Sequence, residues 1–311
     1  LVYLIVCRKR YPACTFKRAS LDRTTFTEIL SFTGWTLFGQ LTTVTRNQAV
    51  TILLNQTFNP TVAAARAIAT TVANQVTIFS TNFNTSLYPP IIKHYSADQT
   101  EEMFSLLIWG SKLTFFLMWV FALPLYLEME TVLRLWLVTP PQEAIYFSQL
   151  ALVEAVIMAI SLPLATAARA PGQMRLYELT LGSIQLLILL ASWALLYIDY
   201  PAESVFYVAI AANALMFFVR LLIVSRLIGL IVSVFLKKVG LPVLTVSLAS
   251  AVPASFVKSA LPSSLVASGF MLFFCIFTST ILMLYVGFDA NNRQRFLEQI
   301  RTRLARLFWT R

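Results

Sequence analysis

Two arginines and one glutamate stand inside long apolar stretches of the sequence, where ionisable residues are rare. Arg46 and Arg66 each lie within such a stretch, and Glu154 lies near the middle of a third one. A charge in the hydrocarbon region of a membrane costs roughly 3 kcal/mol or more, so such residues usually serve a function. A guanidinium group stays protonated and forms paired hydrogen bonds with phosphate. Arg46 and Arg66 are therefore candidate ligands for an anion.

The positions of the two arginines along their helices favour a shared site. Counted from the outer ends of their stretches, they differ in depth by about 8 Å, which matches the spacing of packed helices. One anionic group could touch both, although snorkelling toward the membrane surface is the alternative for Arg66. Lys112, inside a further apolar stretch, is a third candidate. Glu154 either pairs with one of these cations or titrates and couples transport to protons.

Polar side chains repeat at steps of three or four residues around both arginines, which places each set on one helix face. The two sets are Thr36, Gln40, Thr43, Asn47 and Thr51, and Arg66, Thr70, Asn74, Thr77 and Thr81. Two neighbouring helices with such faces would line a water-filled cavity. The alternative is that these groups only bind helices to one another. Gln40, Asn47 and Asn74 are candidate ligands for sugar hydroxyl groups.

The composition identifies the elements that must position these residues as membrane-spanning helices. Of the 311 residues, 58% are hydrophobic and only 12% are charged. This excludes a soluble enzyme, a disordered protein and a disulfide-stabilised scaffold, and predicts an all-α polytopic membrane protein. Pro89 and Pro90 are expected to end one of the spans. The eight expected spans are 28–56, 61–89, 103–123, 143–168, 174–197, 204–226, 239–257 and 264–287.

The basic residues predict the orientation of the spans. The net charge is +10, and the Lys and Arg residues gather in alternate loops and in the last residues of the chain. Such an asymmetry indicates the cytoplasmic side, so we expect a cytoplasmic C-terminus and no nucleic-acid partner. Arg220 and Glu178 lie near cytoplasmic span ends and are expected at the membrane interface. Cys7, Cys14 and Cys275 are too scattered for a metal site, and no cofactor is expected.

The same patterns divide the chain into five parts. Residues 1–7 are apolar but too short to cross a membrane, and we expect them to be the end of a span that begins before this sequence. Residues 8–27 are expected to form a basic cytoplasmic loop. A helical domain would then occupy 28–230, followed by two further spans in 231–287. Residues 288–311 are expected to form a basic amphipathic helix on the surface of anionic lipid.

Two runs of sequence resemble bacterial polysaccharide-biosynthesis flippases of the Wzx-like type. The runs are GWTLFGQLTTVTRNQAVTILLNQTFNPTVAAARAIATTVANQV at 34–76 and FSTNFNTSLYPPIIKHYSA at 79–97. The motifs RNQ, LLN, AARAIA and PPIIK within them carry the likeness, which covers about 28–230. These flippases belong to the MOP superfamily, which also contains the MATE multidrug antiporters.

The resemblance implies two six-helix lobes that form a V around a central cavity. Residues 28–230 would be the second lobe and 231–287 an additional pair of spans, while the first lobe would come from an N-terminal part of the same chain that is missing here. The implied function is to flip undecaprenyl-diphosphate-linked sugars or oligosaccharides across the bacterial inner membrane for surface polysaccharide assembly. Arg46, Arg66 and Lys112 would then hold the diphosphate or acidic sugars. The alternative is a MATE-like cation-coupled efflux antiporter. An enzyme is not expected, because we find no catalytic constellation.

Overall fold

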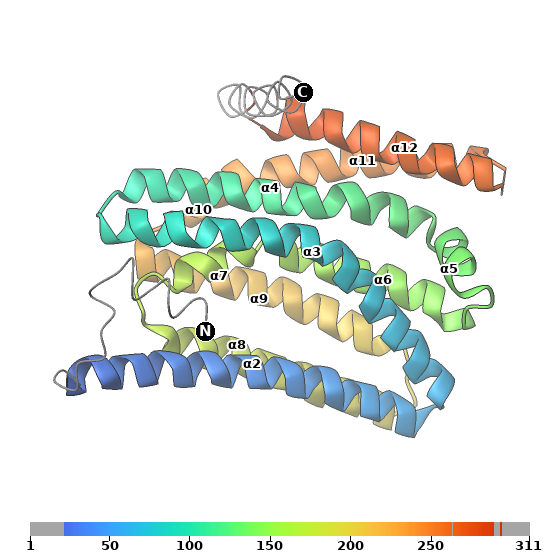
Figure 1. The fold of residues 1–311 in the computed structure, drawn as a ribbon. Coiled ribbons are helices and arrows are strands. Elements are labelled where there is room, and N and C mark those ends of the chain that lie inside the picture. Colours follow the sequence, from blue (N-terminus) through green and yellow to red (C-terminus); the bar gives the residue numbers. More distant parts are fainter. Residues whose placement is uncertain (1–21, 263, 289–292, 294–311) are drawn as a thin grey trace, which may run out of the picture.

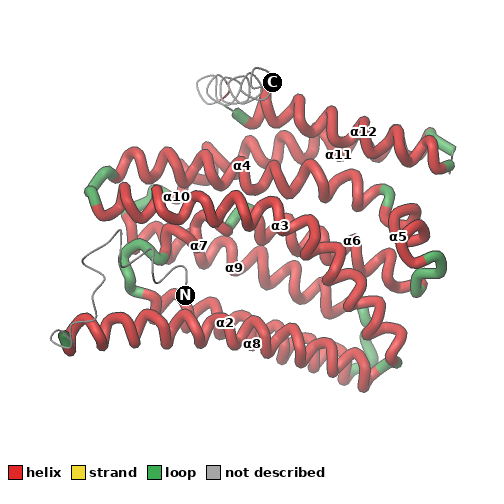
Figure 2. Tube along the Cα trace, viewed as in Figure 1, coloured by secondary structure: helices red, strands yellow, loops and turns green. Residues whose placement is uncertain are grey.

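The protein is a bundle of long helices. The computed structural model describes residues 22–262, 264–288 and 293, and every regular element within this part of the chain is a helix. The long helices run side by side, roughly antiparallel, with short loops at the two ends of the bundle (Figures 1 and 2). The expected helical fold class is therefore confirmed for the described residues. The expected segment 1–7, most of the loop 8–27 and nearly all of the tail 288–311 lie outside them.

The helices follow one another with few intervening residues. In chain order they are α2 (Arg23–Thr57), α3 (Pro60–Ser96), α4 (Thr100–Leu127), α5 (Met129–Leu137), α6 (Gln142–Ala159), α7 (Leu162–Ala168), α8 (Met174–Tyr197), α9 (Ser204–Ile228), α10 (Val232–Phe235), the π-helical turn η1 (Leu236–Gly240), α11 (Leu241–Ala260), α12 (Leu265–Leu282) and the π-helical turn η2 (Met283–Gly287).

Six helical segments of the described chain are long and apolar enough to cross a membrane, which is compatible with a multi-pass membrane protein. They are Pro60–Ser96, Thr100–Leu127, Met174–Tyr197, Ser204–Ile228, Val232–Ala260 and Leu265–Gly287. The bent pair α6–α7 makes a seventh if it counts as one span. The expected first span, α2, has 35 residues but is not among them. The Thr, Asn, Gln and Arg residues of its polar face lower its hydropathy, so the expected number of eight is not reached.

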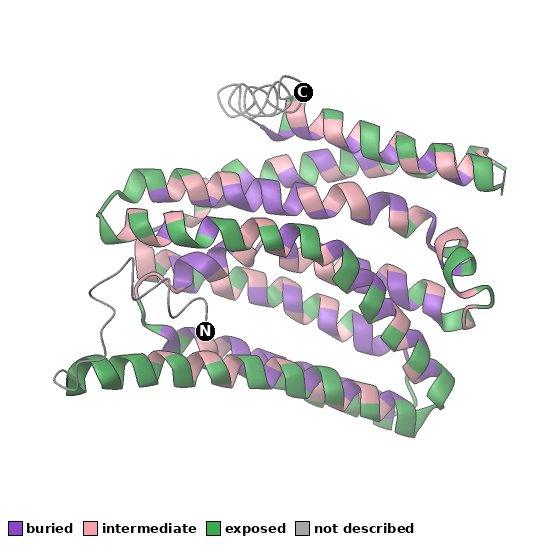
Figure 3. Ribbon diagram, viewed as in Figure 1, coloured by how far each residue is buried: buried purple, intermediate pink, exposed green. Residues whose placement is uncertain are grey.

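The core of the bundle is built around α4. This helix packs against α3 and α6 on one side and against α11 and α12 on the other. Its buried side chains include Phe116 and Met118, which are almost completely covered. In contrast, α2 packs along α8 at the edge of the bundle, and most of its surface is exposed (Figure 3). The helix with the first polar face therefore lies far from the centre of the core.

Local sequence explains where several helices begin and end. The Asp22 carboxylate accepts hydrogen bonds from the backbone N–H groups of Thr24 and Thr25 and so caps α2. Asn59 caps α3 in the same way and precedes Pro60, whose missing N–H is tolerated in a first turn. Helix α9 ends at Gly229, where a φ of 76° favours glycine.

Three features of the helices differ from expectation. Pro89 and Pro90 do not end a span, because they lie inside α3, which continues to Ser96. The stretch 143–168 is not one straight helix: α6 and α7 meet at an angle of 41° just before Pro163. Proline lacks the N–H that would bond to the preceding turn, which accounts for the break. The expected span 239–257 begins earlier in the structure, because Lys237 and Lys238 lie within the helical segment Val232–Ala260.

Candidate functional site

Arg46 is buried on α2, with 7% of its surface exposed. Its Nη1 lies 3.3 Å from Oε1 of Glu154 on α6, and its Nη2 donates a hydrogen bond of 2.8 Å to Oδ1 of Asn47. Its Nε is also buried but has no hydrogen-bond partner among the described residues. A buried donor without a partner is unusual in a native fold. Arg46 therefore has one fixed side and one unused donor.

Glu154 connects Arg46 to a second helix. Its Oε1 also accepts a hydrogen bond of 2.9 Å from Nδ2 of Asn213 on α9. Asn213 is 3% exposed, and the same nitrogen bonds to the carbonyl oxygen of Ala209 one turn earlier. Glu154 therefore lies between two donors, one from α2 and one from α9. Because Arg46 provides the countercharge, the structure favours the predicted pairing role of Glu154, and its titration stays a prediction.

Arg66 completes this cluster from α3. Its Cζ lies 5.6 Å from the centre of the Phe206 ring on α9, a cation–π contact. The Phe206 ring in turn packs against that of Phe147, with centroids 5.0 Å apart. Arg66 is within electrostatic range of both Arg46 and Glu154. We call Arg46, Arg66, Glu154 and Asn213 the charged cluster; it has two positive charges and one negative charge.

The polar faces of α2 and α3 are arranged differently from expectation. Their threonine hydroxyls donate hydrogen bonds to backbone carbonyls of their own helices, which leaves little for a ligand. Gln40, Asn47 and Asn74 are exposed at the surface of the described bundle. Gln40 lines a pocket between α2 and α8, not one between α2 and α3. The predicted cavity shared by α2 and α3 is thus not formed by these helices alone.

Lys112 lies elsewhere. It is 1% exposed inside α4 and is among the largest fully buried side chains of the described chain. Its participation in a site with the two arginines stays a prediction.

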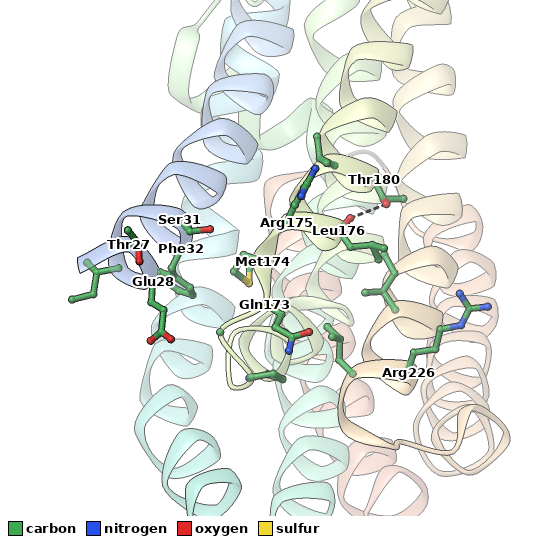
Figure 4. Close-up of a pocket in the computed structure, with 16 residues that line it drawn as sticks. Thr27, Glu28, Ser31, Phe32, Gln173, Met174, Arg175, Leu176, Thr180 and Arg226 are labelled. Carbon is green, nitrogen blue, oxygen red and sulfur yellow. Dashed lines mark hydrogen bonds between the residues drawn. The ribbon is translucent and has the colours of Figure 1, made fainter. Parts of the chain in front are cut away.

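One pocket among the described residues lies at one end of the bundle, with a volume of about 1280 Å³. Figure 4 shows Thr27, Glu28, Ser31 and Phe32 of α2 on one side of it and the first residues of α8 on the other. Arg226 of α9 lies at the far wall, and Arg175 stacks on Trp35, with its Cζ 5.6 Å from the ring centre. None of the predicted ligand residues lines this pocket. Within the described residues, no group of three His, Cys, Asp or Glu side chains could hold a metal ion.

Sequence patterns identified the three charges of the cluster but missed its fourth member, Asn213, and the ring of Phe206 that Arg66 contacts. Asn213 and Phe206 lie within the apolar helix α9, and Phe206 has no pattern that separates it from a lipid-facing residue. Asn213 is a lone amide within a span, which is a usable signal. Arg220, expected to snorkel, instead donates to Ser161 at the break between α6 and α7.

Comparisons with protein-family models, with curated proteins and with solved structures found no match. The site must therefore be interpreted from its own geometry.

Proposed function

We propose that the protein is a transporter that flips undecaprenyl-diphosphate-linked sugars or oligosaccharides across the bacterial inner membrane. The observation that carries this proposal is the charged cluster: two guanidinium groups and a single carboxylate that lie close together on α2, α3 and α6. One positive charge remains uncompensated, and an unpaired charge in a low-dielectric interior attracts an anion. A diphosphate attached to a lipid is an anion of this kind.

In this proposal the two arginines have different roles. Glu154 and Asn47 hold the terminal nitrogens of Arg46, so this guanidinium is oriented before a ligand arrives. Its Nε and the guanidinium of Arg66 are then the donors that meet phosphate oxygens. A donor oriented in advance loses little entropy on binding.

The exposed amides support a larger assembly around this face. Gln40, Asn47 and Asn74 are exposed on long helices, and polar groups facing hydrocarbon are unfavourable. In the proposed transporter, a first lobe covers them and 28–230 acts as a MATE-like second lobe. The cavity between the lobes then contains water and sugar, and the C-terminus is cytoplasmic.

The test uses the complete gene and measures surface polysaccharide together with retention of undecaprenyl diphosphate by the purified protein. Arg46→Ala and Arg66→Ala are expected to reduce both by at least about tenfold, the value of one charged hydrogen bond. Arg134→Ala is the matched control, because Arg134 is exposed and pairs with Glu130 on α5. Export at the wild-type level by both cluster variants, at normal protein abundance, would exclude the proposed site.

One observation favours the MATE-like antiporter as a second candidate. Glu154 is a carboxylate inside the bundle, and such a group could exchange a proton against an organic cation. Drug-resistance assays with Glu154→Gln separate the two functions. An antiporter would lose resistance, whereas a flippase has no resistance to lose.

A further inference from the structure

A second, smaller pocket lies between α2, α7, α8 and α9, with a volume of about 300 Å³. None of the charged-cluster residues lines it. Volumes of about 300 Å³ are at the lower end for small-molecule sites, so the pocket suits one ring-sized group. Polar side chains of α2, α8 and α9, and of Arg169 directly after α7, contribute to its wall: Gln40, Arg169, Tyr177, Glu178, Gln185 and Arg220.

The positive groups of this pocket have unused donors. Arg220 is fixed on one side, because its Nη1 lies 2.5 Å from Oγ and 3.3 Å from the carbonyl oxygen of Ser161. Its Cζ lies 5.8 Å from the centre of the Tyr177 ring. The Nε atoms of Arg220 and Arg169 are buried without a hydrogen-bond partner among the described residues. Two guanidinium groups, each with a buried and unpartnered Nε, therefore line the same pocket.

The acceptors of the pocket are also unused. Gln185 is 7% exposed, and its Oε1 is buried without a partner among the described residues. Glu178 is within electrostatic range of Arg169 and Arg220, yet none of the ion pairs among the described residues joins it to either arginine. Opposite charges that are near but not in contact leave a gap that a ligand with both donors and acceptors can bridge.

Gly39 sets the position of the Glu178 carboxylate. A Cβ atom added at Gly39 would lie 1.8 Å from Oε2 of Glu178, so the carboxylate rests directly against the backbone of α2. The clash involves only the end of a flexible side chain. Gly39→Ala therefore moves the carboxylate while leaving its charge and the packing of the two helices in place.

We propose that this pocket binds one sugar unit that carries a negative charge, a sugar acid such as a hexuronate. Two guanidinium groups against one carboxylate give a net positive charge, which selects an anion. Glu178 and Gln185 supply acceptors for hydroxyl groups, which a simple inorganic anion does not offer. That the ligand is a sugar rests on the proposed function, whereas the pocket and its charges are independent of it.

The test measures binding of glucuronate, glucose and inorganic phosphate to the purified full-length protein in lipid nanodiscs by calorimetry. Glucuronate is expected to bind at least about tenfold more tightly than either other probe, the value of one charged hydrogen bond. Arg169→Gln should remove this preference. Gly39→Ala should weaken glucuronate binding several-fold without changing the melting temperature. Arg175→Gln, which removes the same charge in the first turn of α8 and does not line this pocket, is the control and should bind as the wild type does.

Three outcomes would overturn the inference. They are equal binding of glucuronate and glucose, phosphate binding as tight as that of glucuronate, and unchanged binding in both Arg169→Gln and Gly39→Ala. Arg46→Ala distinguishes this inference from the proposed function. If Arg46→Ala abolishes export but the wild-type protein does not bind glucuronate, only the proposed role of the pocket is refuted. If Arg46→Ala exports normally and the wild-type protein binds glucuronate, only the proposed role of the charged cluster is refuted.

Discussion

The guanidinium group of Arg46 and the carboxylate of Glu154 form an ion pair between α2 and α6, with Nη1 3.3 Å from Oε1. The two residues are 108 positions apart in the chain. Their side chains are 9% and 17% exposed, so both charged groups are largely buried within the protein. Helix α2, which lies at the edge of the bundle, is thereby tied to an inner helix at one point.

This pair should show strong coupling in unfolding experiments. Removing one partner leaves a buried charge uncompensated, so Arg46→Ala and Glu154→Ala should each lower the free energy of unfolding by about 3 kcal/mol. The double variant should lose clearly less than the sum of the two. Titration with SDS in mixed micelles measures the free energy of unfolding of the two single variants and of the double variant. The exposed pair of Glu130 and Arg134 is the control cycle, with a coupling of at most about 0.5 kcal/mol. Additive losses at Arg46 and Glu154 would contradict the pairing.

Glu128, between α4 and α5, should make stability depend on pH. It is 2% exposed; its Oε1 lies 2.6 Å from Nζ of Lys258, and its Oε2 accepts a hydrogen bond of 2.7 Å from Ser268. Burial raises the pKa of this carboxyl, but the hydrogen bonds from Lys258 and Ser268 outweigh it and hold the pKa below its ordinary value of 4.5.

A carboxyl with a lowered pKa stabilises the fold above its unfolded-state pKa and loses this contribution as the pH falls through its folded-state pKa. The melting temperature should therefore decrease as the pH falls below about 4.5. In Glu128→Gln, part of this decrease should be absent, and stability at pH 7 should be lower. Glu130→Gln, at an exposed position, should keep the wild-type profile. An identical acid profile for Glu128→Gln would refute the assignment.

The indole N–H of Trp119 on α4 donates a hydrogen bond of 2.9 Å to Oγ of Ser250 on α11. Ser250→Ala removes the acceptor and should lower the free energy of unfolding by about 1 kcal/mol. Tryptophan fluorescence should also shift, because the indole loses a polar neighbour. Ser255→Ala on the exposed face of α11 removes only a hydrogen bond to its own helix. It should change neither the free energy of unfolding nor the tryptophan fluorescence. Equal effects of the two substitutions would show that the contact contributes nothing specific.

The bend between α6 and α7 should depend on Pro163. Pro163→Ala restores a backbone N–H, so the two helices should approach a single straight helix and the angle should fall below 41°. Spin labels at Glu143 and Gln173, both exposed, would report the change as a longer distance. Pro201→Ala, at a turn elsewhere, is the control. An unchanged distance would mean that the Arg220 contact with Ser161 holds the bend by itself.

The sequence predicted the helices well because their apolar stretches are long and separated by clear breaks. It also selected Arg46, Arg66 and Glu154, because charges are rare in such stretches. The sequence did not predict which helices pack against one another. A repeat of three or four residues defines a helix face but not the helix that this face contacts. Helix α2 was therefore expected to share a cavity with α3, whereas it packs along α8. Arg220 was assigned to the interface because its contact with Ser161 depends on a helix break in another part of the chain.

The packing of α2 along α8 has a consequence for biosynthesis. Helix α2 is less apolar than the six candidate spans, so its own transfer into the bilayer is weakly favoured. The helix that covers it is translated only after α3 to α7. We therefore expect α2 to remain at the translocon until α8 emerges, and early termination before α8 should leave it accessible to labelling from water.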